Sequence, residues 1–197
     1  MRINLHAMQE AAQTGMDAAL KSVSGLTGGQ AVHNTASVST ESMGGNIFVA
    51  NAGVLHISGG AVTDGYSYYR GGNIAFNDGS LVTLSGDAFV QGGSLGTHSA
   101  NCTGENIFLS VTDSLLAISE NAKVIGTGAK PSVFATANGW VEMRGGKVIG
   151  GITVNAASAT NADAGFTMYG GRVDAVAKTG TNAKDSNIRF YNGRVEA

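Results

Sequence analysis

A phrase that the chain states twice in succession constrains its fold more than any other feature. The first copy is GGNIFVANAGVLHISGGAVTDG, starting at Gly44, and the second is GGNIAFNDGSLVTLSGDAFVQGG, starting at Gly71. Each copy holds a short alternating apolar run, a turn with Asn or Asp and Gly, a second alternating run, and a third short run centred on Val. Because alternation with a period of two is typical of β-strands, one phrase predicts one coil of a β-solenoid with three short strands.

The second strand of the phrase recurs along the rest of the chain. Two apolar residues two positions apart place both side chains on the same side of a strand, and such pairs predict the core. The pairs are Leu55/Ile57, Val82/Leu84, Leu116/Ile118, Val141/Met143, Phe166/Met168 and Ile188/Phe190. A doublet rich in Gly, Asn and Asp follows each pair, and successive doublets are separated by 22 residues (Gly171 to Gly193) to 34 residues (Asp87 to Asn121). We therefore expect an all-β solenoid of about six coils whose loops differ in length.

The first and third strands show the same recurrence. The first strand is predicted at Ile47/Val49, Ile74/Phe76, Ile107/Leu109, Val133/Ala135 and Ile152/Val154, and it is hard to find after Ala156. The third strand follows each doublet and is centred on Val62, Phe89 or Val90, Val124, Val148, Val173 and Val195. Asn46, Asn73 and Asn106 directly precede the first strand in three coils. Stacked at a strand spacing of about 4.8 Å, their amides could form a hydrogen-bonded ladder along the solenoid axis.

The segment before the repeats has a different pattern. Apolar residues three and four positions apart in residues 4–23 predict an amphipathic helix, which ends at Ser24-Gly25. We expect residues 1–25 to cap the first coil, because exposed strand edges template association. Residues 26–43 form a lead-in with a candidate imperfect first coil, and residues 44–197 form the solenoid domain.

Composition excludes several classes of partner. The net charge of −2 gives no basis for binding nucleic acid, and no run of 18 apolar residues is present that would insert into a membrane. The first residues lack the apolar core of a secretory signal. Cys102 is the single cysteine, so the chain can form no internal disulfide.

The GGNI-x-V and L-x-I-SGG-x-V pattern, together with the recurring Asn, resembles the right-handed parallel β-helix of the pectin-lyase-like superfold. The likeness is greatest to the degenerate repeats of bacterial surface proteins and adhesins, and it covers residues 44–196. This resemblance implies a right-handed coil of three parallel sheets around an apolar interior. It also implies a capping helix at the N-terminal end, an extracellular or cell-surface location, and contact with carbohydrates or host-surface glycans. It fixes no single activity, because one superfold hosts many.

Catalytic and metal-binding patterns are missing from the sequence. A polysaccharide lyase needs a base and a cation beside the sugar carboxylate, and a hydrolase needs paired carboxylates. The acidic residues lie one at a time in turns, and the NTD, DD and G-H-G motifs of the pectin hydrolases are absent. The four His show no metal-ligand spacing. We expect no catalytic residue, metal or cofactor; if the chain is an enzyme, the resemblance favours a polysaccharide lyase or a glycoside hydrolase.

A column of cations is the most informative candidate site. The residue after the doublet, or one position beyond, is basic in the last four coils, at Lys123, Lys147, Arg172 and Arg194. Stacked on neighbouring strands, these side chains would attract a linear acidic polysaccharide. Alternatively, Asp174 and Glu196 lie two residues after the arginines and would neutralise them as neighbouring-strand pairs.

Two further groups are candidate ligand-binding residues. Arg144, Tyr169 and Tyr191 follow the second strand in the last three coils, where the aromatic rings could stack on sugars or cover the end of the solenoid. The insertion that begins at Asp64 gathers Tyr66, Tyr68, Tyr69 and Arg70. It predicts either a contact surface or a loop folded onto a sheet.

The sequence favours a non-enzymatic β-helix module of a bacterial surface protein, acting as an adhesin or a rigid spacer. Two alternatives remain open: a trimeric phage tail or fibre component, and a polysaccharide lyase or hydrolase. No cap is predicted after Glu196, so the last coil would be covered by other subunits, as in a homotrimer, by a continuation of a longer solenoid, or by nothing at all.

Overall fold

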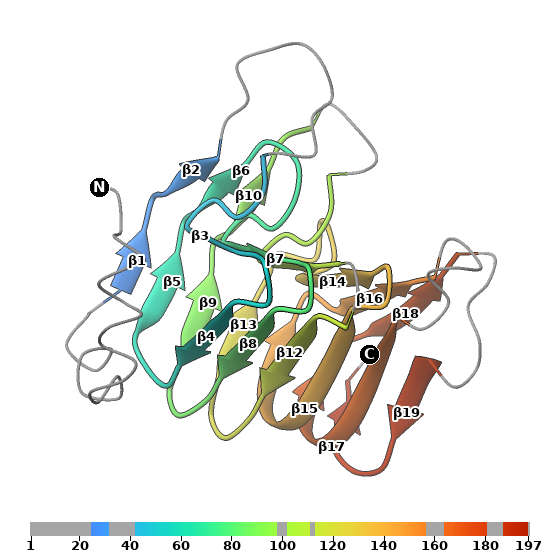
Figure 1. The fold of residues 1–197 in the computed structure, drawn as a ribbon. Coiled ribbons are helices and arrows are strands. Elements are labelled where there is room, and N and C mark those ends of the chain that lie inside the picture. The colour runs from blue at the N-terminus through green and yellow to red at the C-terminus, as the bar shows by residue number, and fades with distance from the viewer. Residues whose placement is uncertain are drawn as a thin grey trace.

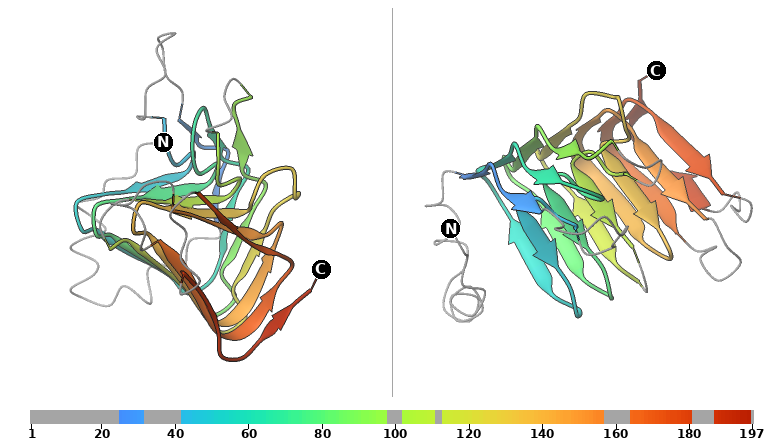
Figure 2. Two further views of the ribbon diagram at one scale, coloured as in Figure 1. Left: turned by 90° about the vertical axis from the view of Figure 1, so that its right-hand side faces the viewer. Right: turned by 90° about the horizontal axis from the view of Figure 1, so that it is seen from above.

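A computed structural model describes residues 25–31, 42–97, 102–110, 113–156, 164–180 and 187–196 of the chain. The helix expected at residues 4–23 and most of the lead-in lie outside these residues. The described residues form a parallel β-solenoid of about five turns (Figure 1). Seen from two further directions, the coils stack on one another from the blue strands at one end to the red strands at the other (Figure 2).

Three sides of the coil correspond to the three predicted strands, and all pairs are parallel. The first side consists of β3 (Ile47–Val49), β7 (Ile74–Phe76), β11 (Ile107–Leu109), β14 (Val133–Thr136), β16 (Ile152–Asn155) and β18 (Val176–Thr179). The second side consists of β4 (Val54–Ile57), β8 (Leu81–Leu84), β12 (Leu115–Ile118), the first halves of β15 (Trp140–Ile149) and β17 (Gly165–Val173), and β19 (Ile188–Phe190). The third side consists of β1 (Gly25–Thr27), β5 (Ala61–Thr63), β9 (Phe89–Gln91), β13 (Lys123–Ile125), the second halves of β15 and β17, and β20 (Arg194–Val195).

Two features of this arrangement were not predicted. Strands β15 and β17 continue through the bend, and they therefore join the second and third sides into one 11-stranded sheet. A short fourth side of β2 (Gln30–Ala31), β6 (Tyr66–Ser67) and β10 (Ser94–Leu95) is added to the early coils, between the third and first sides.

The number of turns is about five because the first and second sides each stack six strands, which enclose five intervals.

The predicted core is confirmed for every coil except the last. The inward pairs of β4, β8, β12, β15 and β17 are all buried and stack in register. The predicted first-strand pairs are buried as well, apart from the half-buried Ile47. In the last coil Ile188 is only partly buried and Phe190 is exposed, because no further described strand pairs with β19.

The doublets form the bends between the second and third sides. The backbone turns there through the left-handed region, with φ of 75° at Gly146 and 55° at Glu120. Glycine adopts this conformation without steric cost, which explains why most of the doublets contain it.

The predicted Asn ladder is present. The amide nitrogen of Asn46 donates to the side-chain oxygen of Asn73 at 2.7 Å, and that of Asn73 donates to Asn106 at 2.8 Å. The ladder then passes to the hydroxyl of Ser132 at 3.1 Å. Each Asn also donates to the carbonyl at the end of a third-side strand, for example from Asn73 to Gln91 at 2.8 Å. Each Asn therefore fastens the end of the third side to the start of the first side within its own coil.

Candidate functional site

The four predicted cations form a column on the third side. Lys123 faces Lys147, Lys147 faces Arg172, and Arg172 faces Arg194 in the parallel register. Val124, Val148 and Val173, the next residue in three of these coils, are fully buried. Because side chains alternate along a strand, the four cations point outward.

The C-terminal half of this column is partly neutralised. Arg172 binds Glu196 with two nitrogens, and its Nε donates to the carboxylate at 3.1 Å. Arg194 reaches the same carboxylate at 3.4 Å. The hydrogen bond from Arg172 holds the pKa of the Glu196 carboxyl below its ordinary value, and the same bond raises the pKa of Arg172. Asp174, the other predicted neutralising residue, accepts from the backbone N–H of Gly150 at 3.1 Å, and its charge also contributes to the raised pKa of Arg172.

The N-terminal half of the column is not neutralised. Neither Lys123 nor Lys147 makes an ion pair with any residue in the described part of the chain. Two ammonium groups on adjacent strands, about 4.8 Å apart at the backbone, repel each other. An anionic group bound between them would relieve this repulsion.

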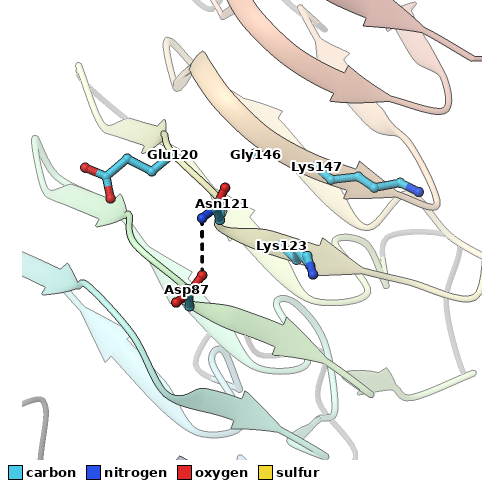
Figure 3. A pocket seen from close by; sticks show the side chains of 6 residues that line it. All are labelled: Asp87, Glu120, Asn121, Lys123, Gly146 and Lys147. Carbon is cyan, nitrogen blue, oxygen red and sulfur yellow. Dashed lines mark hydrogen bonds between the residues drawn. The ribbon is translucent and has the colours of Figure 1, made fainter.

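A shallow hollow of about 360 Å³ lies beside these lysines, at the bend of the coil. Its lining is completed by Asp87, Glu120, Asn121 and Gly146. The carboxylate of Glu120 accepts from the backbone N–H of Gly86 at 2.5 Å, and Asp87 accepts from the amide of Asn121 at 3.4 Å. Figure 3 shows the carboxylate of Glu120 directed away from the two ammonium groups. The acids therefore belong to the bend and leave the lysines available to a ligand.

The predicted aromatic line is assembled on the other side of the same bend. The guanidinium of Arg144 lies over the ring of Tyr169 at 4.7 Å, and the ring of Tyr191 stacks on Tyr169 at 5.0 Å with 6° between the planes. Glu142 binds Arg144 at 2.5 Å. Since Arg144 and Tyr191 lie in the coils on either side of Tyr169, its two faces are covered. A sugar can stack only on the outer face of Tyr191, which is 67% exposed.

The insertion with three Tyr residues packs against the solenoid. Tyr69 is buried, and Tyr66, Tyr68 and Arg70 are half-buried. The guanidinium of Arg70 lies 4.9 Å from the centre of the Tyr69 ring and 4.8 Å from that of Phe108. Burial lowers the pKa of Arg70, and its Nε has no hydrogen-bond partner. The insertion thus begins in β6 on the fourth side and ends with Arg70 over Phe108 of the first side, away from the bend that carries the lysines.

Trp140 has a structural role on the outward face of the second side. Its indole nitrogen donates to the hydroxyl of Thr167 at 3.1 Å, and Arg189 lies 5.3 Å from the ring centre. A Cβ atom at Gly165 would lie 2.2 Å from the indole, so the glycine makes room for the ring. Trp140 and Gly165 are opposite each other in the register of β15 and β17. The sequence reveals this pairing only after the two strands have been aligned.

The described residues contain no group of three or more His, Cys, Asp or Glu that could hold a metal ion. Within the same residues no helix has the length and apolar character needed to cross a membrane. No family model, no curated protein and no solved structure matches the chain.

Proposed function

We propose that this chain is a non-enzymatic β-solenoid module of a bacterial surface protein, of the adhesin type, and that it binds a linear acidic glycan. The ligand lies along the bend between the second and third sides, on the ammonium groups of Lys123 and Lys147. The pectin-lyase-like resemblance of the repeats supports the surface role, and the geometry of the bend supports the ligand class.

The observation that carries the proposal is the contrast within the cation column. Arg172 and Arg194 share a carboxylate of the chain itself, whereas Lys123 and Lys147 face each other without an acidic partner in the described residues. Like charges opposite each other destabilise a sheet, so a structural role alone does not account for the pair. The rigid coil spacing also presents the two charges in a straight line, which suits a polymer with repeated anionic groups.

A binding assay with a matched set of polymers tests the proposal. We expect immobilised polygalacturonate and a sulfated galactan to retain the protein at low salt, and a neutral dextran not to retain it. Retention should fall as salt is raised, because exposed charges are screened within about 8 Å at physiological ionic strength. Equal retention by dextran, or no retention by either acidic polymer, would contradict the ligand class.

The same polymers test the non-enzymatic part. After long incubation with the protein, the chain length of the acidic polymers should be unchanged. Shortened polymer would favour a lyase or a hydrolase, and ultraviolet absorption from an unsaturated product would identify the lyase. For a lyase, the lysine pair would be the candidate groups that neutralise the sugar carboxylate.

A further inference from the structure

A second hollow, of about 400 Å³, lies on the outward face of the second side. Its lining consists of Asp113, Leu115, Asn138, Trp140 and Glu142. None of these residues lines the hollow beside the lysines. A concave space of this size, walled by aromatic and aliphatic side chains with a few polar groups, is the usual form of a small-molecule site.

The register explains why the lining residues meet. Leu115 of β12 pairs with Trp140 of β15, so their outward side chains lie on adjacent strands. Asp113 and Asn138 each lie two residues earlier, in the turn that enters the strand, and both have a left-handed backbone, with φ of 57° and 68°. Glu142 lies two residues after Trp140 and therefore on the same outward face. Two successive coils thus build the hollow, and the register of the core fixes its position.

The polar groups of the hollow lack donors. The carboxylate of Asp113 makes no hydrogen bond or ion pair within the described part of the chain. Arg144 binds Glu142 through Oε1 alone, at 2.5 Å, so Oε2 of Glu142 has no donor among the described residues. The side-chain oxygen of Asn138 is buried and has no hydrogen-bond partner. A buried acceptor of this kind calls for a donor that the described residues do not supply.

The charge and the aromatic wall of the hollow favour a cation as that donor. Among the described residues no basic side chain lines the hollow, so its two carboxylates make it negative. Of the aromatic side chains, an indole attracts cations most strongly. The guanidinium of Arg189, which lies 5.3 Å from the centre of the Trp140 ring, shows this attraction within the chain. Arg189 belongs to β19, beyond β17, and does not line the hollow.

An organic cation suits this lining better than a metal ion does. Ca²⁺ takes about six to eight oxygen ligands. The described residues contain no group of three or more His, Cys, Asp or Glu that could hold a metal ion. A primary ammonium group donates with all its N–H groups and accepts from none, which matches a lining of free acceptors. An aliphatic body attached to it would pack on Leu115.

We propose that this hollow binds a small organic amine in its protonated form. The ammonium group donates to the carboxylate of Asp113 and to Oε2 of Glu142, and the aliphatic chain lies between Leu115 and the ring of Trp140. The site is separate from the lysine bend and takes a ligand of the opposite charge. It therefore does not rest on the proposed glycan function.

The fluorescence of Trp140, the single tryptophan of the chain, tests the site directly. Butylammonium, butanol and butyrate share one aliphatic body and differ in charge, and they are compared at equal ionic strength. We expect butylammonium to change the emission saturably, with a dissociation constant at least roughly tenfold lower than that of butanol, because its hydrogen bonds are charge-assisted. Butyrate and Ca²⁺ should cause no saturable change.

A matched pair of variants tests the role of the free carboxylate. Asp113→Asn should raise the dissociation constant of butylammonium by roughly tenfold, because it removes the unpaired charge. Asp78→Asn makes the same exchange in an exposed turn of the preceding coil and should leave the constant unchanged. Both aspartates have a left-handed backbone, with φ of 57° and 54°, which asparagine tolerates equally well. Thermal unfolding of each variant reports that the fold is kept.

Several results would overturn the proposal. They are the absence of a saturable change with butylammonium, equal affinity for butanol, saturation by Ca²⁺, and wild-type affinity in Asp113→Asn. The double variant Lys123→Gln/Lys147→Gln should bind butylammonium as the wild type does. Because the assay contains no glycan, its failure and a failure of the proposed function are distinguishable.

Discussion

Lys123 and Lys147 face each other on adjacent parallel strands, and neither has an acidic partner in the described residues. The next pair in the column, Arg172 and Arg194, shares the carboxylate of Glu196. Neighbouring coils with the same register therefore present two different electrostatic surfaces. The difference depends on one glutamate, and this makes the binding surface open to direct tests.

Removing that glutamate's charge should extend the binding surface. Glu196→Gln releases Arg172 and Arg194, so we expect tighter binding of a sulfated polysaccharide, by roughly tenfold for two added charge contacts. Isothermal titration at low salt measures the change. The control is Asp78→Asn, which removes a carboxylate charge from an exposed turn and should leave the affinity unchanged. Glu105→Gln would not serve as a control, because Glu105 is buried. Unchanged affinity of Glu196→Gln would show that the arginines do not contact the polymer.

Acid should act in the same direction as this substitution. The folded chain holds the pKa of the Glu196 carboxyl below its ordinary value, so the ion pairs are complete above that value and are lost as the pH falls through the lowered pKa. Sulfate groups stay charged in this range. Binding of a sulfated polymer should therefore strengthen in acid for the wild-type chain and less for Glu196→Gln. Parallel pH profiles of the two proteins would show that protonation of Glu196 does not control binding of the polymer.

Loss of one rung of the Asn ladder should destabilise the fold strongly. Asn73 is fully buried, donates to Gln91 and Asn106, and accepts from Asn46 and the N–H of Gly65. Asn73→Ala leaves several of these buried groups without partners and should lower the free energy of unfolding by about 3 kcal/mol. Urea unfolding measures this value. Asn121→Ala, an exposed amide with a single 3.4 Å contact, should change it by less than about 0.5 kcal/mol.

The contact between Trp140 and Gly165 can be followed by fluorescence, because the chain has one tryptophan. Gly165→Ala would place a Cβ 2.2 Å from the indole, displace the ring and break its hydrogen bond to Thr167. We expect a red-shifted emission and a loss of about 1–3 kcal/mol of stability. Gly59→Ala, whose Cβ would meet no atom within 4 Å, should alter neither quantity. If the emission of Gly165→Ala were not shifted, the indole ring of Trp140 would not lie against Gly165.

The sequence predicted the features that repeat. The inward columns of Val82/Leu84 and Val141/Met143, the Asn ladder and the cation column all depend on a constant register from coil to coil, and the repeated phrase specifies that register. The stack of Tyr169 on Tyr191 could be predicted in the same way, since both residues occupy the same position after the second strand of their coils.

The features that do not repeat could not be predicted. The phrase says nothing of how an insertion folds, so the burial of Tyr69 and the contact of Arg70 with Phe108 emerged only from the structure. One of the two interpretations of the cation column expected Asp174 and Glu196 to neutralise the arginines in part. Glu196 makes the ion pairs, whereas Asp174 accepts from the N–H of Gly150 and acts on Arg172 through its charge. The choice between such partners depends on side-chain direction, which periodicity does not contain.

The role of the lysine pair is tested by the salt dependence of binding to a sulfated galactan, measured for the wild-type chain and for the double variant Lys123→Gln/Lys147→Gln. We predict that the double variant binds at least about tenfold more weakly at low salt, with a shallower decline as salt rises. Lys130→Gln, which alters an exposed lysine outside the column, should behave as the wild type. If the double variant kept the wild-type affinity and the same decline with salt, the lysine pair would not be the binding site.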